Sequence, residues 1–322
     1  MHMQVRAGGF RGLYFIHSKD AAMLSQDSLT HPSSRRNALR TLGTAGLALG
    51  ALGALPAQSA TSSERGLAAN QPLAQKNAII TGARNNIGRG IAEGLAALGA
   101  NVLVHYHKPD DRSQAEETGR LAREAGAGKV AYAMGDLGKP ENVRQMFDVA
   151  ERELGGVDIL INNAGAIVKK PIAELTDEEY MRCWNINEWG TFLCMREAAN
   201  RMNKEGRIIN IVTSIVPALT PNYGAYAASK AANAQLVRVL SKEIGGPDRM
   251  ITVNSVHPGP IDTPFFRGPE SEDAIAYATQ MANMNRLGQI SDVVPLVQFL
   301  ATPAAQWITG ESLFVNGGYL ES

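Results

Sequence analysis

The sequence lacks the features of several common protein classes. Its only two cysteines, Cys183 and Cys194, exclude a disulfide-based scaffold. The 31 basic and 31 acidic residues balance, which argues against a nucleic-acid-binding protein with a strongly basic surface. No stretch after the N-terminal region reaches the roughly 18 apolar residues of a membrane-spanning helix, so a multi-span membrane protein is excluded. With 44% hydrophobic residues, however, the chain can bury a large core.

Recognisable metal-binding patterns are also missing. The sequence contains no HExxH, no CxxC and no EF-hand loop, and its six histidines do not have the spacing of metal ligands. We therefore expect no metal site. Cys183 and Cys194 lie eleven positions apart on one predicted helix, or about 16 Å by helical rise, so they cannot form a disulfide. We expect two unpaired, buried thiols.

The charge is unevenly distributed along the chain. Residues 1–60 hold six basic and two acidic residues, which is +4, and the remainder therefore carries −4. Arg35 and Arg36 precede an uncharged stretch rich in Leu, Ala and Gly at 41–57, after which small residues follow. This order is typical of an export signal, and the paired arginines resemble the twin-arginine type, although Ala38 stands where that motif usually has Phe. We predict an export signal in 1–60, a linker at 61–75 and a periplasmic location; the alternatives are a disordered extension or a mistaken start codon, and a cytoplasmic location.

From about residue 75 onward, short β-branched runs alternate with amphipathic stretches of helical period. The pattern predicts strands at 77–81, 100–105, 129–134, 157–161, 207–212, 251–256 and 312–315, and helices at 87–98, 113–125, 141–154, 177–203, 225–244 and 291–300. Such alternation indicates an α/β fold, a Rossmann-type doubly wound parallel sheet of seven strands with helices on both faces. We expect one catalytic domain over residues 76–322. The segment 259–289 has no clear pattern and is expected to form a mobile lobe over the site.

A glycine-bearing turn connects the first predicted strand to the first helix. It contains Gly82, Arg84, Asn86, Ile87 and Gly88. A turn of this kind presents backbone N–H groups and a helix N-terminus to a phosphate pair. It therefore predicts a dinucleotide site.

With this turn, the sequence resembles the short-chain dehydrogenase/reductase family over residues 76–319. The family motif is TGxxxGxG, and this chain has Asn86 in place of the middle glycine. Asn is the non-glycine side chain that best tolerates positive φ, so the turn is expected to survive. Within the family, the chain looks most like ketoacyl-carrier-protein reductases and pteridine reductases.

The end of the second strand favours NADP(H) over NAD(H). An NAD enzyme usually has an acidic residue here to bind the ribose 2′-hydroxyl, but this strand ends in His105-Tyr106-His107-Lys108. His107 and Lys108, with Arg84, could surround a 2′-phosphate. We therefore expect NADP(H) as the cofactor.

The family resemblance assigns further cofactor contacts by position. Asp136 and Leu137 stand where the family contacts adenine. The Asn-Asn-Ala-Gly motif places Asn163, Ala164 and Gly165 near the cofactor ribose. The His-Pro-Gly segment contributes Pro258, Gly259, Ile261 and Thr263, whose backbone groups would hold the nicotinamide carboxamide.

Tyr226 and Lys230 carry the clearest catalytic signal. Tyr and Lys at i and i+4 share a helix face, and of the eight tyrosines only Tyr226 has a lysine four positions later. A phenol has a pKa of about 10, and a nearby ammonium favours its ionised form. We predict that Tyr226 is the acid/base and that Lys230 lowers its pKa and binds the nicotinamide ribose.

The family also uses a hydroxyl and an asparagine. The usual spacing to the tyrosine selects Thr213, whereas the usual residue type selects Ser214, and both remain candidates. Asn187 matches the family's asparagine, which holds a relay water through the lysine.

Together these features predict an NADP(H)-dependent oxidoreductase that transfers a hydride between nicotinamide and a small-molecule carbonyl or alcohol. The alternatives are an epimerase or isomerase of the same fold, or a non-catalytic NADP(H) sensor. The family also implies a homotetramer or homodimer formed through the helices at 177–203 and 225–244. We expect no nucleic-acid partner and no stable membrane span.

Overall fold

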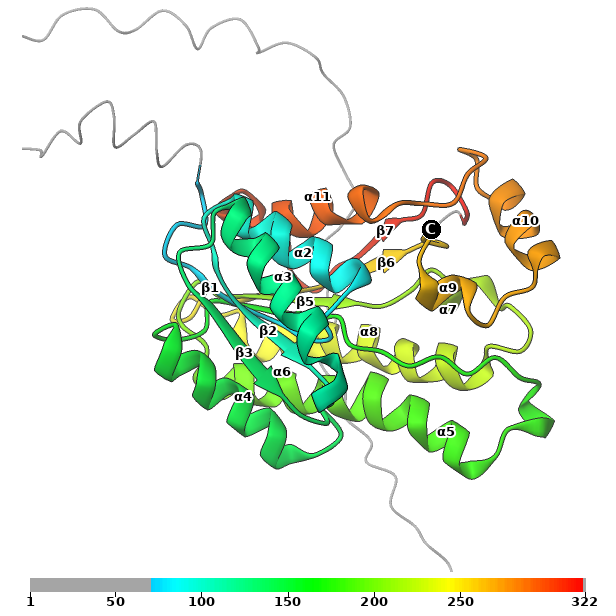
Figure 1. The fold of residues 1–322 in the computed structure, drawn as a ribbon, viewed down its shortest axis with the longest axis horizontal. Coiled ribbons are helices and arrows are strands. Elements are labelled where there is room, and N and C mark those ends of the chain that lie inside the picture. Colours follow the sequence, from blue (N-terminus) through cyan, green and yellow to red (C-terminus); the bar gives the residue numbers. More distant parts are fainter. Residues whose placement is uncertain (1–70, 321–322) are drawn as a thin grey trace, which may run out of the picture. The chain divides into compact units, whose positions relative to one another are not determined.

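The computed structural model describes residues 71–320, which form a seven-stranded parallel sheet with helices on both faces (Figure 1). The proposed export signal lies outside these residues. The strands are β1 (Asn77–Ile80), β2 (Asn101–Tyr106), β3 (Val130–Met134), β4 (Ile159–Asn162), β5 (Arg207–Ile211), β6 (Thr252–Pro258) and β7 (Ser312–Val315). Every expected strand is present, so the predicted fold class is confirmed.

The strand order is β3-β2-β1-β4-β5-β6-β7. The chain first builds outward from β1 to β3 and then returns to pair β4 with the other side of β1. The direction of winding therefore reverses between β1 and β4. In an open parallel sheet, ligands bind beyond the carboxyl ends of the strands at this point. The fold thus predicts the location of a site before any side chain is considered.

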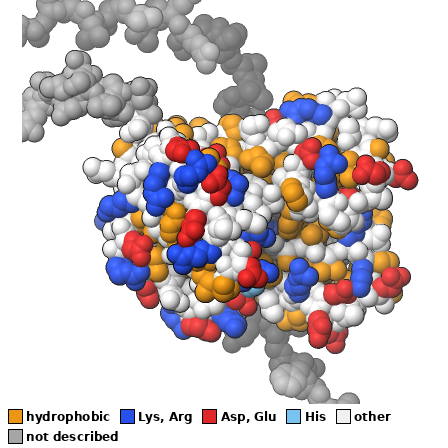
Figure 2. Space-filling model, in the orientation of Figure 1, with side chains coloured by type: hydrophobic (Ala, Val, Ile, Leu, Met, Phe, Trp, Pro, Cys, Tyr) orange, Lys and Arg blue, Asp and Glu red, His pale blue; other side chains and the backbone are white. Residues whose placement is uncertain are grey.

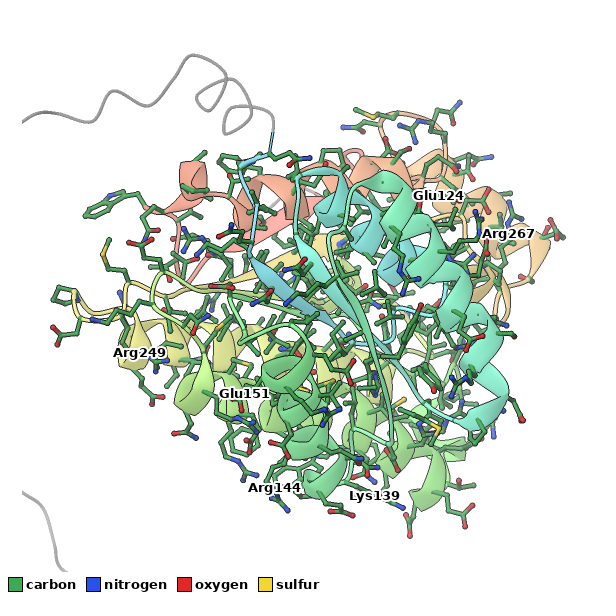
Figure 3. All side chains as sticks on the ribbon, turned by 60° about the vertical axis from the view of Figure 1, so that its left-hand side comes forward. Glu124, Lys139, Arg144, Glu151, Arg249 and Arg267 are labelled. Carbon is green, nitrogen blue, oxygen red and sulfur yellow. The ribbon has the colours of Figure 1, made fainter. Side chains whose placement is uncertain are left out.

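The residues of the central strands β1, β4 and β5 are all buried, as is usual for a parallel sheet that helices cover on both faces. One layer contains α2 (Asn86–Ala97), α3 (Arg112–Ala125) and α11 (Ile290–Ala301), and the other contains α4 (Pro140–Glu153), α6 (Gly190–Arg201) and α8 (Gly224–Ile244). Each layer packs its own apolar cluster against the sheet. Charged side chains of the outer helices, such as Glu124, Arg144 and Glu151, point away from it (Figure 3).

The expected continuous helix at 177–203 is interrupted. It consists of α5 (Asp177–Cys183), a π-helix (η3, Trp184–Trp189) and α6, which ends at Arg201. The hydrophobic period alone could not reveal this, since a single wider turn leaves the overall pattern helical. π-Helical turns are frequent at functional sites, and Asn187 lies in this one.

The segment 259–289 contains two helices that the sequence pattern did not predict, α9 (Pro264–Arg267) and α10 (Glu272–Met281). They lie near the end of the sheet where β6 finishes (Figure 1). A further short helix, α7 (Ile215–Ala218), follows β5, and single turns of 3₁₀-helix occur at η1 (Pro109–Asp111), η2 (Ile172–Glu174) and η4 (Pro303–Ala305). Apart from α10, these elements are too short to show a helical period.

The packed core includes a residue that precedes Lys76. Leu73, within the expected linker, is buried in the core, and its N–H donates to the Leu98 carbonyl. Both cysteines are buried and unpaired, as expected. Among residues 71–320, no helix combines the length and hydrophobicity needed to cross a bilayer. Basic and acidic side chains intermix on the face shown in Figure 2.

Candidate active site

A cavity of about 780 Å³ opens at the carboxyl ends of the strands, where the winding reverses. Its walls come from the loops that follow β1 to β6 and from α9 and α10. All of the site residues predicted from the sequence line this cavity except Asn187. Residues that are far apart in the chain are thus brought together at one place.

The glycine-bearing turn is packed closely against the loop after β4. Gly82 has a φ of +62°, and a Cβ there would lie 2.9 Å from the Ala164 Cα. A Cβ at Gly88 would lie 2.6 Å from the Asn163 amide nitrogen. Asn86 adopts a φ of +49°, so the expectation that asparagine can replace the usual glycine is confirmed. Because side chains are excluded here, the backbone can approach a ligand closely.

Thr81 joins this turn to the loop after β4. Its hydroxyl oxygen accepts hydrogen bonds from the N–H groups of Asn163 and Ala164, at 2.9 and 3.0 Å. The Asn163 amide donates to the Thr81 carbonyl at 2.9 Å and to the Gly82 carbonyl at 3.2 Å. The role of Asn163 is therefore to hold the two loops together. Thr81 was not among the predicted site residues, although it directly precedes Gly82.

His105 supports the same turn from the end of β2. The Gly82 N–H donates to its Nδ1 at 3.2 Å, so the other ring nitrogen, Nε2, donates to the Gly135 carbonyl at 3.0 Å. These partners define a neutral imidazole protonated at Nε2. Burial lowers the pKa of His105 to about 4, which keeps the ring neutral. His105 is a supporting residue that sequence reasoning missed.

Basic side chains gather where a 2′-phosphate was expected. His107 and Lys108 are exposed at the mouth of the cavity, and Arg84 lines it beside them. The Arg84 guanidinium donates to the Gln114 side chain at 2.5 Å and lies 3.4 Å from Asp111 Oδ1. Asp111 is buried and was not predicted. It holds the guanidinium in place, so three cations or donors face this end of the cavity.

Asp136 and Leu137 occupy the loop after β3. The Asp136 carboxylate accepts a hydrogen bond from the Gly138 N–H at 2.9 Å, which fixes the turn. Leu137 is buried, and a Cβ on Gly190 would lie 3.0 Å from the Leu137 Cβ. This loop therefore presents an apolar wall and a carboxylate to the same cavity.

Thr213 and Ser214 point to different places. Thr213 lies close enough to the Tyr226 phenol to lower its pKa, and the Thr213 Oγ1 accepts a hydrogen bond from the Ile215 N–H at 3.2 Å. The Ser214 hydroxyl instead donates to the His257 carbonyl at 3.0 Å and is 1% exposed. The geometry therefore favours Thr213 as the hydroxyl that faces a substrate. His257 supports it by donating from Nδ1 to the Thr213 carbonyl at 3.2 Å.

Tyr226 and Lys230 are both buried on α8. Burial raises the pKa of Tyr226, and the neighbouring Thr213 side chain offsets this only in part. Without ligand, the phenol is therefore held in its protonated form rather than having the lowered pKa we expected. Burial lowers the pKa of Lys230 to about 8, and its ammonium donates to the Ile211 carbonyl at 2.8 Å.

Asn187 lies behind the cavity and is fully buried. Its side chain bonds both the N–H and the carbonyl of Ala166 at 2.8 Å, and it donates to the Ser229 hydroxyl at 2.9 Å. A Cβ on Gly165 would lie 3.2 Å from Asn187 Oδ1 and 3.5 Å from Lys230 Nζ. Asn187 thus places the loop after β4 next to the lysine.

The segment after β6 closes another side of the cavity. The Pro258 carbonyl accepts from the Ser214 N–H at 2.8 Å, and the Gly259 N–H donates to the Val315 carbonyl at 3.1 Å. Ile261 pairs with Gly288 in an isolated bridge. The Thr263 hydroxyl caps α9 by accepting from the Phe266 N–H at 3.3 Å.

Aromatic rings form much of the remaining wall, beyond Tyr226. Tyr223, Phe265, Phe266, Tyr277 and Tyr319 all line the cavity. The Tyr226 ring centre lies 6.3 Å from that of Tyr223 and 6.5 Å from that of Phe265. The region also contains the charged pair Lys169 and Glu270. Within residues 71–320, no group of three or more His, Cys, Asp or Glu side chains is placed to hold a metal ion.

The sequence is similar to those of known dehydrogenases and reductases. A family model described as Enoyl-(Acyl carrier protein) reductase matches residues 82–320. A Short-chain type dehydrogenase/reductase from Picea abies is 40% identical over 76% of this chain and 93% of its own. An NADPH-dependent aldehyde reductase-like chloroplastic protein from Arabidopsis thaliana is 38% identical over 77% and 96% of the two chains.

The fold also matches that of a solved structure. The crystal structure of a dehydrogenase from Burkholderia cenocepacia with bound NADP superposes with a TM-score of 0.75. It is 38% identical and covers 82% of this chain and all of its own. The chain belongs to the short-chain dehydrogenase/reductase family.

Proposed function

We propose that the protein reduces carbonyl compounds with Tyr226 as its proton donor. The chain is an NADP(H)-dependent oxidoreductase of the short-chain dehydrogenase/reductase family that acts on carbonyl substrates. The observation that carries the proposal is the buried Tyr226 phenol, which lies beside Thr213 in a cavity that the glycine-bearing turn also lines. A neutral phenol can give a proton to the oxygen of a carbonyl group as that group is reduced.

The residues at the glycine-bearing turn would hold the cofactor. The backbone at Gly82 to Gly88 and the N-terminus of α2 suit a pyrophosphate, and Arg84, His107 and Lys108 suit a 2′-phosphate. When bound, NADPH supplies the hydride that reduces the carbonyl carbon. The residues expected beside its adenine, ribose and nicotinamide are Asp136, Leu137, Asn163, Ala164, Gly165, Pro258, Gly259, Ile261 and Thr263.

Thr213 and Tyr226 would bind the substrate oxygen together. Each hydroxyl can donate one hydrogen bond to a carbonyl oxygen, and two donors at a developing negative charge stabilise it. After giving up its proton, Tyr226 carries a phenolate that the buried ammonium of Lys230 favours. A proton from solvent then restores the phenol, and Asn187 positions the loop along which this transfer is expected.

The test is NADPH oxidation by the full-length chain against a panel of ketones, aldehydes, quinones and pterins. We expect turnover with at least one carbonyl class. Tyr226→Phe should lose about 10²–10⁴-fold in rate while still binding NADPH. Conversion without net NADPH consumption would support an epimerase instead. Binding without any turnover by the unmodified chain would support a sensor.

We also propose that residues 1–60 are a twin-arginine export signal. The support is the paired arginines, the uncharged stretch and the small residues that follow. N-terminal sequencing of the mature protein from the periplasmic and cytoplasmic fractions tests this. A mature chain that keeps Arg35 and Arg36 would contradict it.

Finally, we propose a homodimer or homotetramer that associates through α5, α6 and α8. Tyr180 and Met181 on α5 and Val239 on α8 are large apolar side chains exposed on these helices. Such exposure is typical of a surface that another chain covers. Light scattering should give two or four times the monomer mass, and Val239→Glu should lower it.

A further inference from the structure

The substrate end of the cavity contains a buried ion pair that the proposed chemistry does not use. The Lys169 ammonium lies 2.5 Å from Glu270 Oε2, and the Glu270 side chain is only 4% exposed. The Tyr223 hydroxyl donates to the other oxygen of the same carboxylate. All three residues line the cavity. A buried carboxylate is costly unless it is paired, and here both of its oxygens have partners.

These three residues come from three separate segments. Lys169 lies in the loop after β4, Tyr223 directly precedes α8, and Glu270 lies between α9 and α10. The first two segments are already joined, because the N–H next along the chain, that of Lys170, donates to the Asn222 carbonyl at 2.8 Å. The Glu270 carboxylate therefore connects the segment between α9 and α10 to the other two segments.

The α9–α10 segment, residues 264–281, has few other attachments. Its flanks are tied by two backbone hydrogen bonds: the Asp262 N–H donates to the Gly288 carbonyl, and the Gly288 N–H donates to the Pro260 carbonyl. Its apolar contacts form a small cluster apart from the main core. In the part of the chain that the structure describes, Glu270 makes both side-chain hydrogen bonds that join this segment to distant parts of the sequence. Glu270 thus governs how the segment sits against the cavity.

The segment also contributes part of the cavity wall near the proposed proton donor. Phe265 lies on α9, and its ring centre is 6.5 Å from that of Tyr226. The ring centre of Tyr223 is 6.3 Å from that of Tyr226. Lys169 Nζ lies 5.5 Å from the centre of the Tyr223 ring, which adds a cation–π contact. A shift of Glu270 would therefore move the two rings that flank Tyr226.

We propose that Glu270 is a positioning residue that, through Lys169 and Tyr223, holds the α9–α10 segment over the carbonyl-binding end of the cavity. This inference rests on the proposed function, in which Tyr226 and Thr213 bind the carbonyl oxygen. Since the Glu270 side chain bonds Lys169 and Tyr223 and no residue of the glycine-bearing turn, it controls the KM for the carbonyl substrate and leaves NADPH affinity and kcat nearly unchanged.

The first test compares Glu270→Gln with Glu272→Gln, an exposed glutamate on the same segment. Gln keeps the size of the side chain and can still accept from Tyr223, so the variant is expected to fold. Glu270→Gln should raise the carbonyl KM about tenfold with kcat within about threefold, because a buried charged hydrogen bond is weakened. Glu272→Gln should behave like the unmodified protein.

Charge exchange then separates a specific pair from a general loss of packing. Lys169→Glu and Glu270→Lys each place like charges together and should raise KM by more than about tenfold. The double variant restores opposite charges, so its KM should return to within about threefold of the original value. No recovery in the double variant would overturn the proposal, as would a loss in NADPH affinity equal to the change in KM.

Tryptic cleavage after Arg267 provides a readout that does not depend on activity. Arg267 lies on α9 with 45% of its side chain exposed (Figure 3). Glu270→Gln should speed this cleavage several-fold in the full-length chain, and Glu272→Gln should not. If no carbonyl is reduced but cleavage is faster, the proposed function fails while the positioning role of Glu270 stands. If carbonyls are reduced but KM and cleavage are unchanged, the positioning role fails.

Discussion

Thr213 lies beside the Tyr226 phenol and lowers its pKa, whereas the neighbouring Ser214 hydroxyl is turned away and donates to the His257 carbonyl at 3.0 Å. Two adjacent hydroxyls thus have different surroundings. One faces the cavity beside the proposed proton donor. The other is buried and serves the packing of β5 against β6.

This difference predicts opposite outcomes for two substitutions. Thr213→Val should lower kcat for carbonyl reduction about 10²-fold or more, because a donor to the substrate oxygen is lost. Thr213→Ser should retain most activity. Ser214→Ala should keep kcat within about threefold and cost about 1 kcal/mol of stability through the lost buried hydrogen bond. Steady-state kinetics measure kcat, and urea unfolding measures stability. A larger loss of kcat in Ser214→Ala than in Thr213→Val would show that Ser214, and not Thr213, binds the substrate oxygen.

The basic group at the cavity mouth should set cofactor preference. His107→Ala with Lys108→Ala should raise the KM for NADPH about tenfold or more and leave that for NADH nearly unchanged, because NADH lacks the 2′-phosphate. Lys129→Ala is the matched control, as Lys129 is exposed just before β3, at the opposite end of the sheet. Equal losses with both cofactors would show that these side chains do not read the phosphate.

The lowered pKa of Lys230 has a consequence for stability. The folded pKa is about 8 and the unfolded value is 10.5. Between these values the unfolded chain binds more protons, so the free energy of unfolding should rise with pH in this window by up to about 1.4 kcal/mol per pH unit. Urea unfolding at pH 7.5 and 9.5 should show this rise relative to Lys230→Met, which lacks the titrating group. Parallel changes in both proteins would contradict it.

His105 should make the fold sensitive to acid. Its folded pKa is about 4 against 6.5 in the unfolded chain, so its stabilising contribution is complete above pH 6.5 and is lost as the pH falls toward 4. In His105→Asn this loss should be absent, and unfolding curves at pH 7.5 and 5 should differ less than in the unmodified protein. NADPH affinity should also fall in the variant, because the shorter asparagine cannot bond the Gly82 N–H and the Gly135 carbonyl together, as His105 does. Unchanged affinity would show that the turn does not need this support.

Much of the fold and of the site could be predicted from the sequence. The alternation of β-branched and amphipathic runs indicated all seven strands, because each strand and helix carries its own local period. Tyr226 and Lys230 could be predicted as a catalytic pair because a spacing of four defines one helix face. The positive φ of Asn86 followed from the side chain itself.

Other parts of the site depend on contacts between distant segments. The choice between Thr213 and Ser214, the π-helical turn at Asn187 and the support from His105 are set by partners far away in the chain. The Lys169–Glu270 pair joins residues 101 positions apart, within a region that has no periodic pattern. The sequence by itself determined the fold class and the kind of chemistry, since both follow from local residue types and spacing. Only the tertiary structure decided which hydroxyl and which carboxylate face the cavity, because side-chain direction and burial are set by packing.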